Sequence, residues 1–237
     1  MLVPRGALDR RRPTLLYVAG VGGSGRETAE WAPHLGDVAV VTAVRRRPPT
    51  LEQEPTLEAR AAALAAQLLM QPLPRELVVV GHSLGAIVGY ELVEILERDA
   101  PGTVASLVVS GQLPPHRIVY RGAAGVTGIA VLRRMRDNAA LPPEVEEAPD
   151  LLESFLPHWQ AELRALEAYR RLTPHRLATK LHVWTGRDDV MTQDAEAMSR
   201  WADCAQEPPA FRTFPGRHDF LFRAESGVPQ ALAELFS

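Results

Sequence analysis

Short apolar runs alternate with longer amphipathic stretches along most of the chain. The apolar runs are rich in β-branched residues, which is typical of strands buried on both faces of a sheet. The predicted strands cover residues 14–19, 37–44, 77–80, 103–110, 180–185 and 210–214. Apolar residues at helical spacing predict helices over residues 28–35, 56–71, 86–94, 193–204 and 228–236. Strands that alternate with helices predict an α/β fold with a mainly parallel, doubly wound sheet.

Residues 113 to about 172 break this alternation, because they contain no convincing strand and have a helical pattern. The segment separates two strands of the predicted sheet. An insertion of this length in a compact domain is more often functional than a simple connection. We therefore expect a single domain over residues 1–237 with a helical lid at residues 113–172. The alternative is extra helical packing on one face of the sheet.

Composition narrows the classes of function. The chain has 237 residues, 46% hydrophobic, and a formal net charge of −3, which fits one domain with a full core. This charge disfavours nucleic-acid binding, and no apolar run is long enough to span a membrane. The single cysteine, Cys204, excludes an internal disulfide and suits the cytoplasm. Residues 1–12 include LVPRG, which resembles a protease-site remnant, so we expect them to be disordered or tag-derived.

The segment VVVGHSLGAIVGY, residues 78–90, contains the pattern G-x-S-x-G between a predicted strand and a predicted helix. Gly81 and Gly85 flank Ser83 at a sharp turn, where only small residues let the strand and the helix approach each other. Such a turn lifts the serine hydroxyl above the sheet edge. It also puts the amide of Leu84 at a helix N-terminus, where it can stabilise an oxyanion. Ser83 is therefore the predicted nucleophile.

A serine nucleophile needs a base, and the base needs an acid that orients it. His218 is the predicted base, because it alone of the seven histidines lies just after the last strand, at the carboxyl edge of the sheet. The preceding strand ends at Gly186 and is followed by Asp188 and Asp189. Either carboxylate could reach the imidazole, and we expect the other to be a turn or cap residue.

The glycine loop AGVGGSG, residues 19–25, has two interpretations. Gly20, Gly22 and Gly25 match the G-x-G-x-x-G of dinucleotide-binding loops, and arginines at 45–47 follow the second strand, where a 2′-phosphate would bind. That alternative, an NADP-binding protein, does not explain the elbow, the aspartate pair and His218 together. In a serine hydrolase the same loop supplies a second oxyanion amide, because small residues let the backbone approach the substrate.

With these motifs the chain resembles the type II thioesterases that accompany nonribosomal peptide and polyketide assembly lines. The resemblance extends over most of the chain and rests on GHSLGAIVGYELVEIL, LVVSGQLPPH, LLESFLPHWQAELRALEAY, TGRDD and GRHDFL. It implies an α/β-hydrolase fold with a helical lid. In that family the acid is the third residue after the glycine, which implies Asp189. Val21 or Gly22 would then provide the second oxyanion amide beside Leu84.

The resemblance implies a thioesterase that removes acyl groups from the phosphopantetheine thiol of acyl or peptidyl carrier proteins, through an acyl-enzyme on Ser83. It implies no metal and no bound cofactor. An esterase, lactonase or acyltransferase that acts on a free small molecule with the same triad remains an alternative. Carrier proteins generally present an acidic helix, so basic residues in or beside the lid are candidates for docking. These are Arg121, Arg133, Arg134 and Arg136.

Overall fold

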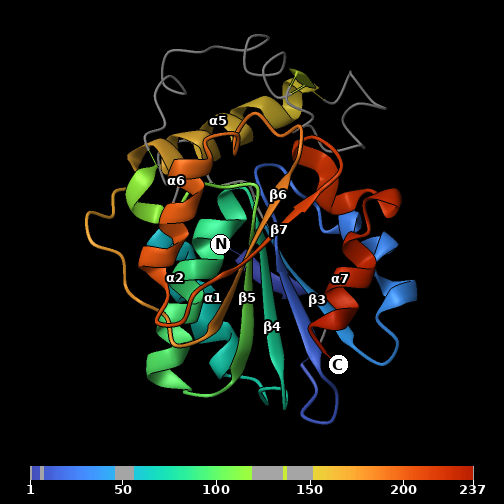
Figure 1. Cartoon of the computed structure of the whole chain (residues 1–237). Helices are drawn as coiled ribbons and strands as arrows, with labels where there is room; N and C mark the ends of the chain where they lie inside the picture. The colour runs from blue at the N-terminus through green and yellow to red at the C-terminus, as the bar shows by residue number, and fades with distance from the viewer. Residues whose placement is uncertain (1, 6–7, 46–55, 119–135, 138–151, 237) are drawn as a thin grey trace.

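A seven-stranded sheet with helices on both faces forms the body of the molecule (Figure 1). The structure is a computed structural model, and it describes residues 2–5, 8–45, 56–118, 136–137 and 152–236. The strand order is β1-β3-β2-β4-β5-β6-β7. Strand β1 pairs antiparallel with β3, and every other neighbouring pair is parallel. The predicted α/β fold with a mainly parallel sheet is confirmed.

The elements follow the order expected from the sequence. The strands are β1 (Leu2–Arg5), β2 (Thr14–Val18), β3 (Ala39–Arg45), β4 (Leu77–His82), β5 (Val104–Ser110), β6 (Lys180–Gly186) and β7 (Ala210–Phe214). The α-helices are α1 (Leu57–Leu69), α2 (Leu84–Asp99), α5 (Leu152–Ala168), α6 (Ala195–Ser199) and α7 (Val228–Glu234). The 3-10 helices are η1 (Arg26–Glu30), η2 (Ala32–His34), η3 (Pro115–Arg117), η5 (Arg200–Cys204), η6 (His218–Phe222) and η7 (Ala224–Ser226).

The central strands divide their side chains between two cores. On β2, Leu16 and Val18 belong to the core that also contains the buried residues of α1 and α2. Leu15 and Tyr17, on the opposite face, pack in the core that contains Trp31 and the buried residues of α7. Successive side chains of a strand point to opposite faces, so a strand covered on both sides must be apolar throughout. This explains why the central strands appear in the sequence as unbroken apolar runs.

Two segments differ from the predicted helices. Residues 28–35 lie in two short 3-10 helices rather than one α-helix. Pro33 lacks a backbone N–H, and Gly25 and Gly36 have positive φ on either side, so a continuous α-helical ladder has little length in which to form. The predicted helix at 193–204 is α-helical only over α6 and continues as 3-10 helix from Arg200.

The N-terminal segment also differs from the expectation of disorder. Leu2–Arg5 forms the edge strand β1, in antiparallel register with β3 from Arg45 to Thr42. Farther along, Leu8 is buried in the core beside α1. The edge of a sheet presents unpaired N–H and C=O groups, so a short extended segment next to β3 gains hydrogen bonds there even without a strong strand pattern.

Helix α5 is the longest described part of the predicted lid, and it lies across the end of the sheet at the top of Figure 1. Just after the helix, Tyr169 Oη donates to Glu91 Oε1 of α2 over 2.5 Å. Arg171 Nη1 lies 2.8 Å from both carboxylate oxygens of Glu91, and Arg171 Nη2 lies 2.7 Å from Glu94 Oε2. These bonds fix the end of α5 to α2. Residues 119–135 and 138–151 of the predicted lid lie outside the described residues.

Helix α2 begins so close to the sheet that its first turn has no room for side chains. A Cβ added to Gly85 would lie 2.1 Å from the carbonyl oxygen of Val18 on β2, and one added to Gly81 would lie 2.3 Å from the carbonyl oxygen of Gly85. Both distances are far below van der Waals contact, and both neighbours are backbone atoms that cannot rotate away. Gly81 and Gly85 are therefore required by the packing of α2 on β2 and β4.

This packing predicts opposite effects for two alanine substitutions in one helix. Gly85→Ala should lower the free energy of unfolding by about 3 kcal/mol, because α2 must move off the sheet. Gly89→Ala should leave it unchanged or raise it by up to about 1 kcal/mol, because the nearest atoms to an added Cβ are 3.5 Å away and alanine favours the helix. Urea unfolding of both variants measures the difference. Equal losses would show that α2 tolerates a shift at its N-terminus.

Candidate active site

The predicted site residues follow four strands that end at the same edge of the sheet. The glycine loop follows β2, Ser83 follows β4, Asp189 follows β6 and His218 follows β7. All four strands are parallel, so their carboxyl ends lie together, and this edge is where α/β proteins place their sites. The expectation that distant motifs meet at one edge therefore follows from the topology.

Ser83 occupies a strained turn between β4 and α2. Its φ is 54° and its ψ is −125°, and within the described ranges it is the one non-glycine residue with positive φ. Its N–H donates to the carbonyl oxygen of Ser110 at the end of β5 over 2.8 Å, which fixes the turn to the sheet. Strain of this kind persists only where the surroundings impose it, and it is concentrated at functional sites. The side chain of Ser83 is neither fully buried nor fully exposed.

His218 and Asp189 form a buried hydrogen-bonded pair. His218 Nδ1 donates to Asp189 Oδ2 over 2.9 Å, and the exposed fractions of the two residues are 4% and 1%. The other carboxylate oxygen of Asp189 accepts from the N–H of Met191 over 3.0 Å. Asp188 is exposed, and its N–H donates to the carbonyl oxygen of Gly216. Of the two aspartates that the sequence left open, Asp189 is the one that contacts the imidazole.

A second histidine ring, that of His82, packs against His218, and it was not among the predicted site residues. The rings of His82 and His218 have centroids 4.7 Å apart, and His82 Nδ1 lies 3.0 Å from Ser110 Oγ. Burial, and then repulsion from His218 when that imidazole is protonated, hold the pKa of His82 well below its ordinary value, which favours the neutral ring. A Cβ on Gly111 would lie 2.9 Å from the His82 ring and 3.0 Å from the His218 ring. The sequence feature that could have indicated this contact is Gly111, a glycine directly after β5, where a side chain would collide with both rings.

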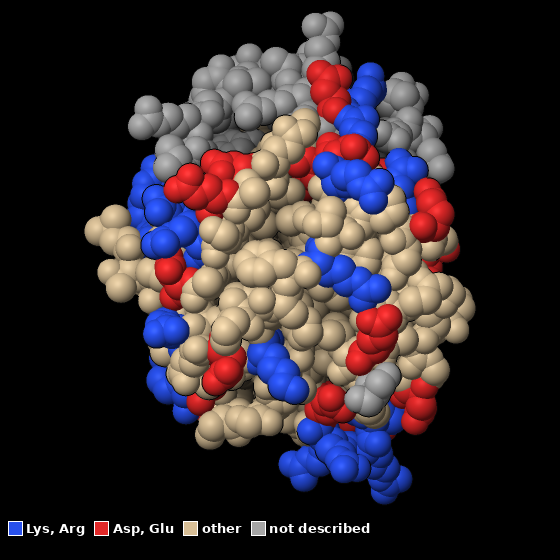
Figure 2. Space-filling model, viewed as in Figure 1, with Lys and Arg blue, Asp and Glu red and all other residues tan. Residues whose placement is uncertain are grey.

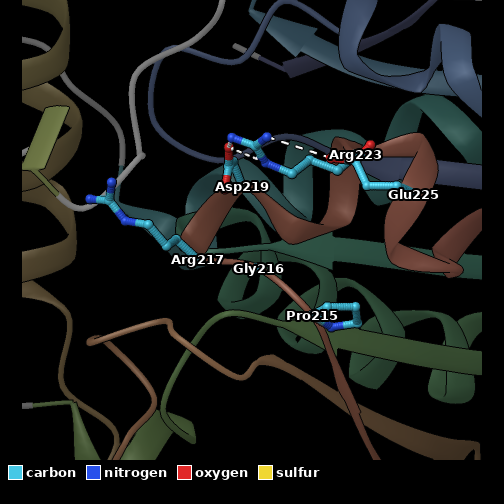
Figure 3. A pocket seen from close by; sticks show the side chains of 6 residues that line it. All are labelled: Pro215, Gly216, Arg217, Asp219, Arg223 and Glu225. Atoms are coloured by element: carbon cyan, nitrogen blue, oxygen red, sulfur yellow. Dashed lines mark hydrogen bonds and ion pairs between the residues drawn. The ribbon is translucent and has the colours of Figure 1, made fainter.

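The loop that carries His218 also lines a cleft of about 280 Å³ (Figure 3). Its lining residues are Pro215, Gly216, Arg217, Asp219, Arg223 and Glu225. Asp219 Oδ2 accepts from Arg223 Nε over 2.7 Å, and Arg223 Nη1 lies 3.6 Å from Glu225 Oε1. Arg217 extends away from this group toward α5 in the view of Figure 3. Asp219 is thus engaged by Arg223, as expected for a loop residue that is not the partner of His218.

The glycine loop lies directly against the elbow. A Cβ on Gly20 would be 3.1 Å from the carbonyl oxygen of His82 and 3.2 Å from the Cβ of Ser83. Gly22 differs from its expected role, because its N–H donates to Glu162 Oε2 of α5 over 2.8 Å. An amide that already donates to a carboxylate is not available to an oxyanion. Within the described part of the chain, no acceptor is found for the N–H of Val21.

This geometry disfavours the dinucleotide alternative. A dinucleotide-binding loop leads into an α-helix whose N-terminus faces the pyrophosphate. Here the loop leads into η1, a 3-10 helix of five residues. The Glu162 carboxylate occupies the Gly22 amide and would repel a phosphate. Of the three arginines at 45–47, only Arg45 is among the described residues, at the end of β3.

The remaining candidates can be placed only in part. Arg121, Arg133 and Arg134 lie outside the described residues, and Arg136 is exposed.

Cys204 is fully buried, and burial, with the neighbouring charge of Asp203, raises the pKa of its thiol to about 12, which makes it unreactive. On the face shown in Figure 2, acidic and basic side chains are interspersed over most of the surface, and basic side chains gather at the bottom of the view. The described helices include none that is both long enough and apolar enough to cross a membrane.

Comparison with known proteins places the chain in a family. Residues 13–236 match the family model of the thioesterase domain. The chain is 33% identical, over 196 residues, to a probable cadicidin biosynthesis thioesterase of Streptomyces griseus, covering 80% of this chain and 51% of the relative. The chain thus spans about half the length of this curated relative.

Solved structures show the same fold over nearly the whole chain. The RedJ thioesterase from the prodiginine biosynthetic pathway in Streptomyces coelicolor is 26% identical and superimposes with a TM-score of 0.84, covering 98% of this chain and 94% of that one. The type II thioesterase BorB from the borrelidin biosynthetic cluster, at 23% identity, shares the fold with a TM-score of 0.83, over 99% of this chain and 97% of its own. The chain therefore belongs to the thioesterase domain family and has the α/β-hydrolase fold.

Proposed function

We propose that this protein hydrolyses acyl thioesters carried on the phosphopantetheine arm of carrier proteins, with Ser83, His218 and Asp189 as its catalytic triad. Three observations support the proposal: the strained turn at Ser83, the buried His218–Asp189 pair whose imidazole packs on His82, the residue before Ser83, and the match to the thioesterase domain family. A strained serine next to a histidine that is itself oriented by a carboxylate is the arrangement required for nucleophilic catalysis.

The mechanism follows from the proton positions that this geometry allows. Because Nδ1 of His218 donates to Asp189, Nε2 carries the lone pair and can take the proton of Ser83 Oγ. Oγ then attacks the thioester carbonyl carbon. The pantetheine sulfur takes the proton held on Nε2 and leaves as a thiol. In the second half, Nε2 takes a proton from water, the hydroxide attacks the acyl-enzyme, and the proton returns to Ser83 as the free acid leaves. Asp189 keeps the imidazole in its tautomer and stabilises the imidazolium.

The developing oxyanion needs donors that are not engaged elsewhere. Leu84 N–H lies in the first turn of α2, next to the nucleophile. Of the two amides expected from the glycine loop, we assign the second donor to Val21, because Gly22 N–H donates to Glu162. Two backbone donors held by packed elements stabilise the tetrahedral intermediate without having to reorganise during the reaction.

Carrier proteins are the proposed partners, because the curated relative and the solved structures bear the names of biosynthetic pathways for cadicidin, prodiginine and borrelidin. Editing of an assembly line and a cytoplasmic location belong to the same proposal. A thioesterase of this kind should hydrolyse acyl-pantetheine and acyl-carrier protein much faster than p-nitrophenyl esters. The reverse preference would favour the alternative, an esterase that acts on free small molecules.

The role of Ser83 predicts the behaviour of one variant. Ser83→Ala should fold like the wild type and lose thioesterase activity by several orders of magnitude, because no other hydroxyl occupies the turn. A fluorophosphonate probe, located by peptide mass analysis, should label Ser83 in the wild type and nothing in the variant. Retained activity, or a label on another residue, would refute Ser83 as the nucleophile.

The adjacent aspartates provide a matched pair. Asp189→Asn should lower kcat by about 10⁴-fold, since the imidazole loses the charge that orients and stabilises it. Asp188→Asn should change kcat by less than about threefold, because Asp188 is exposed and its side chain is not bonded to His218. Steady-state kinetics on an acyl-N-acetylcysteamine thioester compares the two. If Asp188→Asn were the slower enzyme, the assignment of the acid would be wrong.

Docking of the carrier protein is proposed to use Arg121, Arg133, Arg134 and Arg136. Replacing Arg133, Arg134 and Arg136 by glutamine should lower kcat/KM for an acyl-carrier protein, and the loss should fade at high salt because exposed charges act mainly on the association rate. Hydrolysis of acyl-N-acetylcysteamine, which has no acidic helix, should stay nearly unchanged. Equal losses on both substrates would instead indicate damaged packing, and no loss on either would remove these arginines from the docking surface.

A further inference from the structure

Helix α5 contacts the glycine loop through one buried carboxylate. Glu162 is 6% exposed, and its Oε2 accepts the Gly22 N–H over 2.8 Å. Its other oxygen, Oε1, lies 3.4 Å from Nη1 of Arg60 on α1, which is 3% exposed. Glu162 therefore joins three elements that are far apart in sequence: the glycine loop, α1 and α5. A charge buried at this depth is costly unless it is paired, and here the pairing group is a second buried charge.

The ring of Trp159 closes the same contact from one side. A Cβ on Gly22 would lie 2.2 Å from Trp159 Nε1, so the indole packs on the bare backbone of Gly22. Gly22 itself has a φ of 72°, in the left-handed region that glycine tolerates. A loop of four glycines in seven residues has high conformational freedom in isolation. Trp159 and Glu162 remove that freedom at the position next to Val21.

Val21 is thereby held from both sides. Its N–H belongs to the peptide plane that begins at Gly20, and Gly20 packs on His82 and Ser83 of the elbow. Its carbonyl belongs to the plane that ends at the Gly22 N–H, and Glu162 fixes the direction of that N–H. The only soft torsions between these two planes are those of Val21 itself. Fixing the Gly22 N–H therefore limits the torsions of Val21 and, through them, the directions that the Val21 N–H can take.

We propose that Glu162 is a positioning residue that aims the Val21 amide at the oxyanion, with Arg60 as its counterion. The proposal rests on the proposed function, since it concerns the second oxyanion donor of that reaction. Helix α5 is also bound to the helix that carries the first donor, because Tyr169 bonds Glu91 of α2. The loop with one donor is thus bound to α5, and the helix with the other donor is bound to the residue directly after α5. Glu162 acts through the loop and does not touch the reacting atoms.

Two double variants isolate the hydrogen-bond acceptor from the buried charge. In Glu162→Gln with Arg60→Met, the glutamine carbonyl can still accept the Gly22 N–H, and both charges of the Arg60–Glu162 pair are removed. In Glu162→Leu with Arg60→Met, the acceptor is gone and again no charge is left. The first should keep kcat within about threefold of the wild type. The second should lower kcat by about 10–100-fold with KM within about twofold, because only the transition state uses the oxyanion donor.

A transition-state mimic provides a readout that a merely structural role would not move. A trifluoromethyl ketone forms a tetrahedral adduct with a serine nucleophile, so its inhibition constant should rise in parallel with the loss of kcat in the leucine variant and stay near the wild-type value in the glutamine variant. Equal values in both variants, or a loss confined to KM, would overturn the positioning role.

If the leucine variant does not fold, a conservative variant still tests whether Glu162 positions the Val21 amide. Glu162→Asp keeps the charge toward Arg60 but withdraws the carboxylate from Gly22 by one methylene, so kcat should fall while urea unfolding changes little. Glu167→Asp makes the same change on the same helix, away from the glycine loop, and should leave kcat unchanged. If Glu162→Asp and Glu167→Asp had the same kcat, the proposal would be wrong.

The same comparison can be made without a thioester substrate. The rate at which a fluorophosphonate labels Ser83 also depends on the oxyanion donors, so it should follow the same order of variants. A wild type that is labelled at Ser83 but does not hydrolyse acyl-pantetheine would refute the proposed function alone. Equal labelling rates in the glutamine and leucine variants would refute the role of Glu162 alone.

Discussion

The close approach of α2 to the sheet is the constraint on which the rest of the structure depends. Backbone atoms of neighbouring segments occupy the positions that a Cβ would take at Gly81 and Gly85. Ser83, in the turn between these two glycines, has a φ of 54°. That conformation costs roughly 1–3 kcal/mol, which the packing of two apolar cores must offset. Because β4 and residues 84–93 of α2 are buried, the turn between them has little room to relax. The hydroxyl of Ser83 therefore stays at the edge of the sheet.

The other site groups are arranged around this turn by contacts of the same kind. Ser110 accepts the Ser83 N–H, Gly20 packs on the elbow, and Gly111 lets the rings of His82 and His218 approach each other. Asp189 then fixes His218 through a buried hydrogen bond. Apart from the Asp189–His218 bond, each of these contacts uses a backbone atom or a glycine, so the site needs small residues at the strand ends as well as its polar side chains. Helix α5 adds to this arrangement through the hydrogen bond of Glu162 to the Gly22 N–H.

Much of this could be predicted from the sequence, because local pattern decides it. Unbroken apolar runs identified the central strands, and the positions of Ser83 and His218 just after predicted strands placed both residues at one edge of the sheet. Contacts between distant residues could not be predicted in the same way: Gly22 and Glu162 are 140 residues apart, and no local signal links them. The choice between Asp188 and Asp189 depends on which side chain the turn after β6 directs inward, and the residues alone left it open. Strand β1 was not predicted, because an edge strand can pair with the unpaired N–H and C=O groups of its neighbour, here β3, without a strong strand pattern of its own.

The central claim is that an acyl group passes through Ser83 on its way from the pantetheine thiol to water. Intact-mass analysis of the protein, quenched within milliseconds of mixing with an acyl-carrier protein, tests it most directly. The account predicts a transient increase equal to the mass of the acyl group, located on the peptide that contains Ser83, which decays as free acid appears. Release of the acid with no adduct, or an adduct on a different residue, would contradict it.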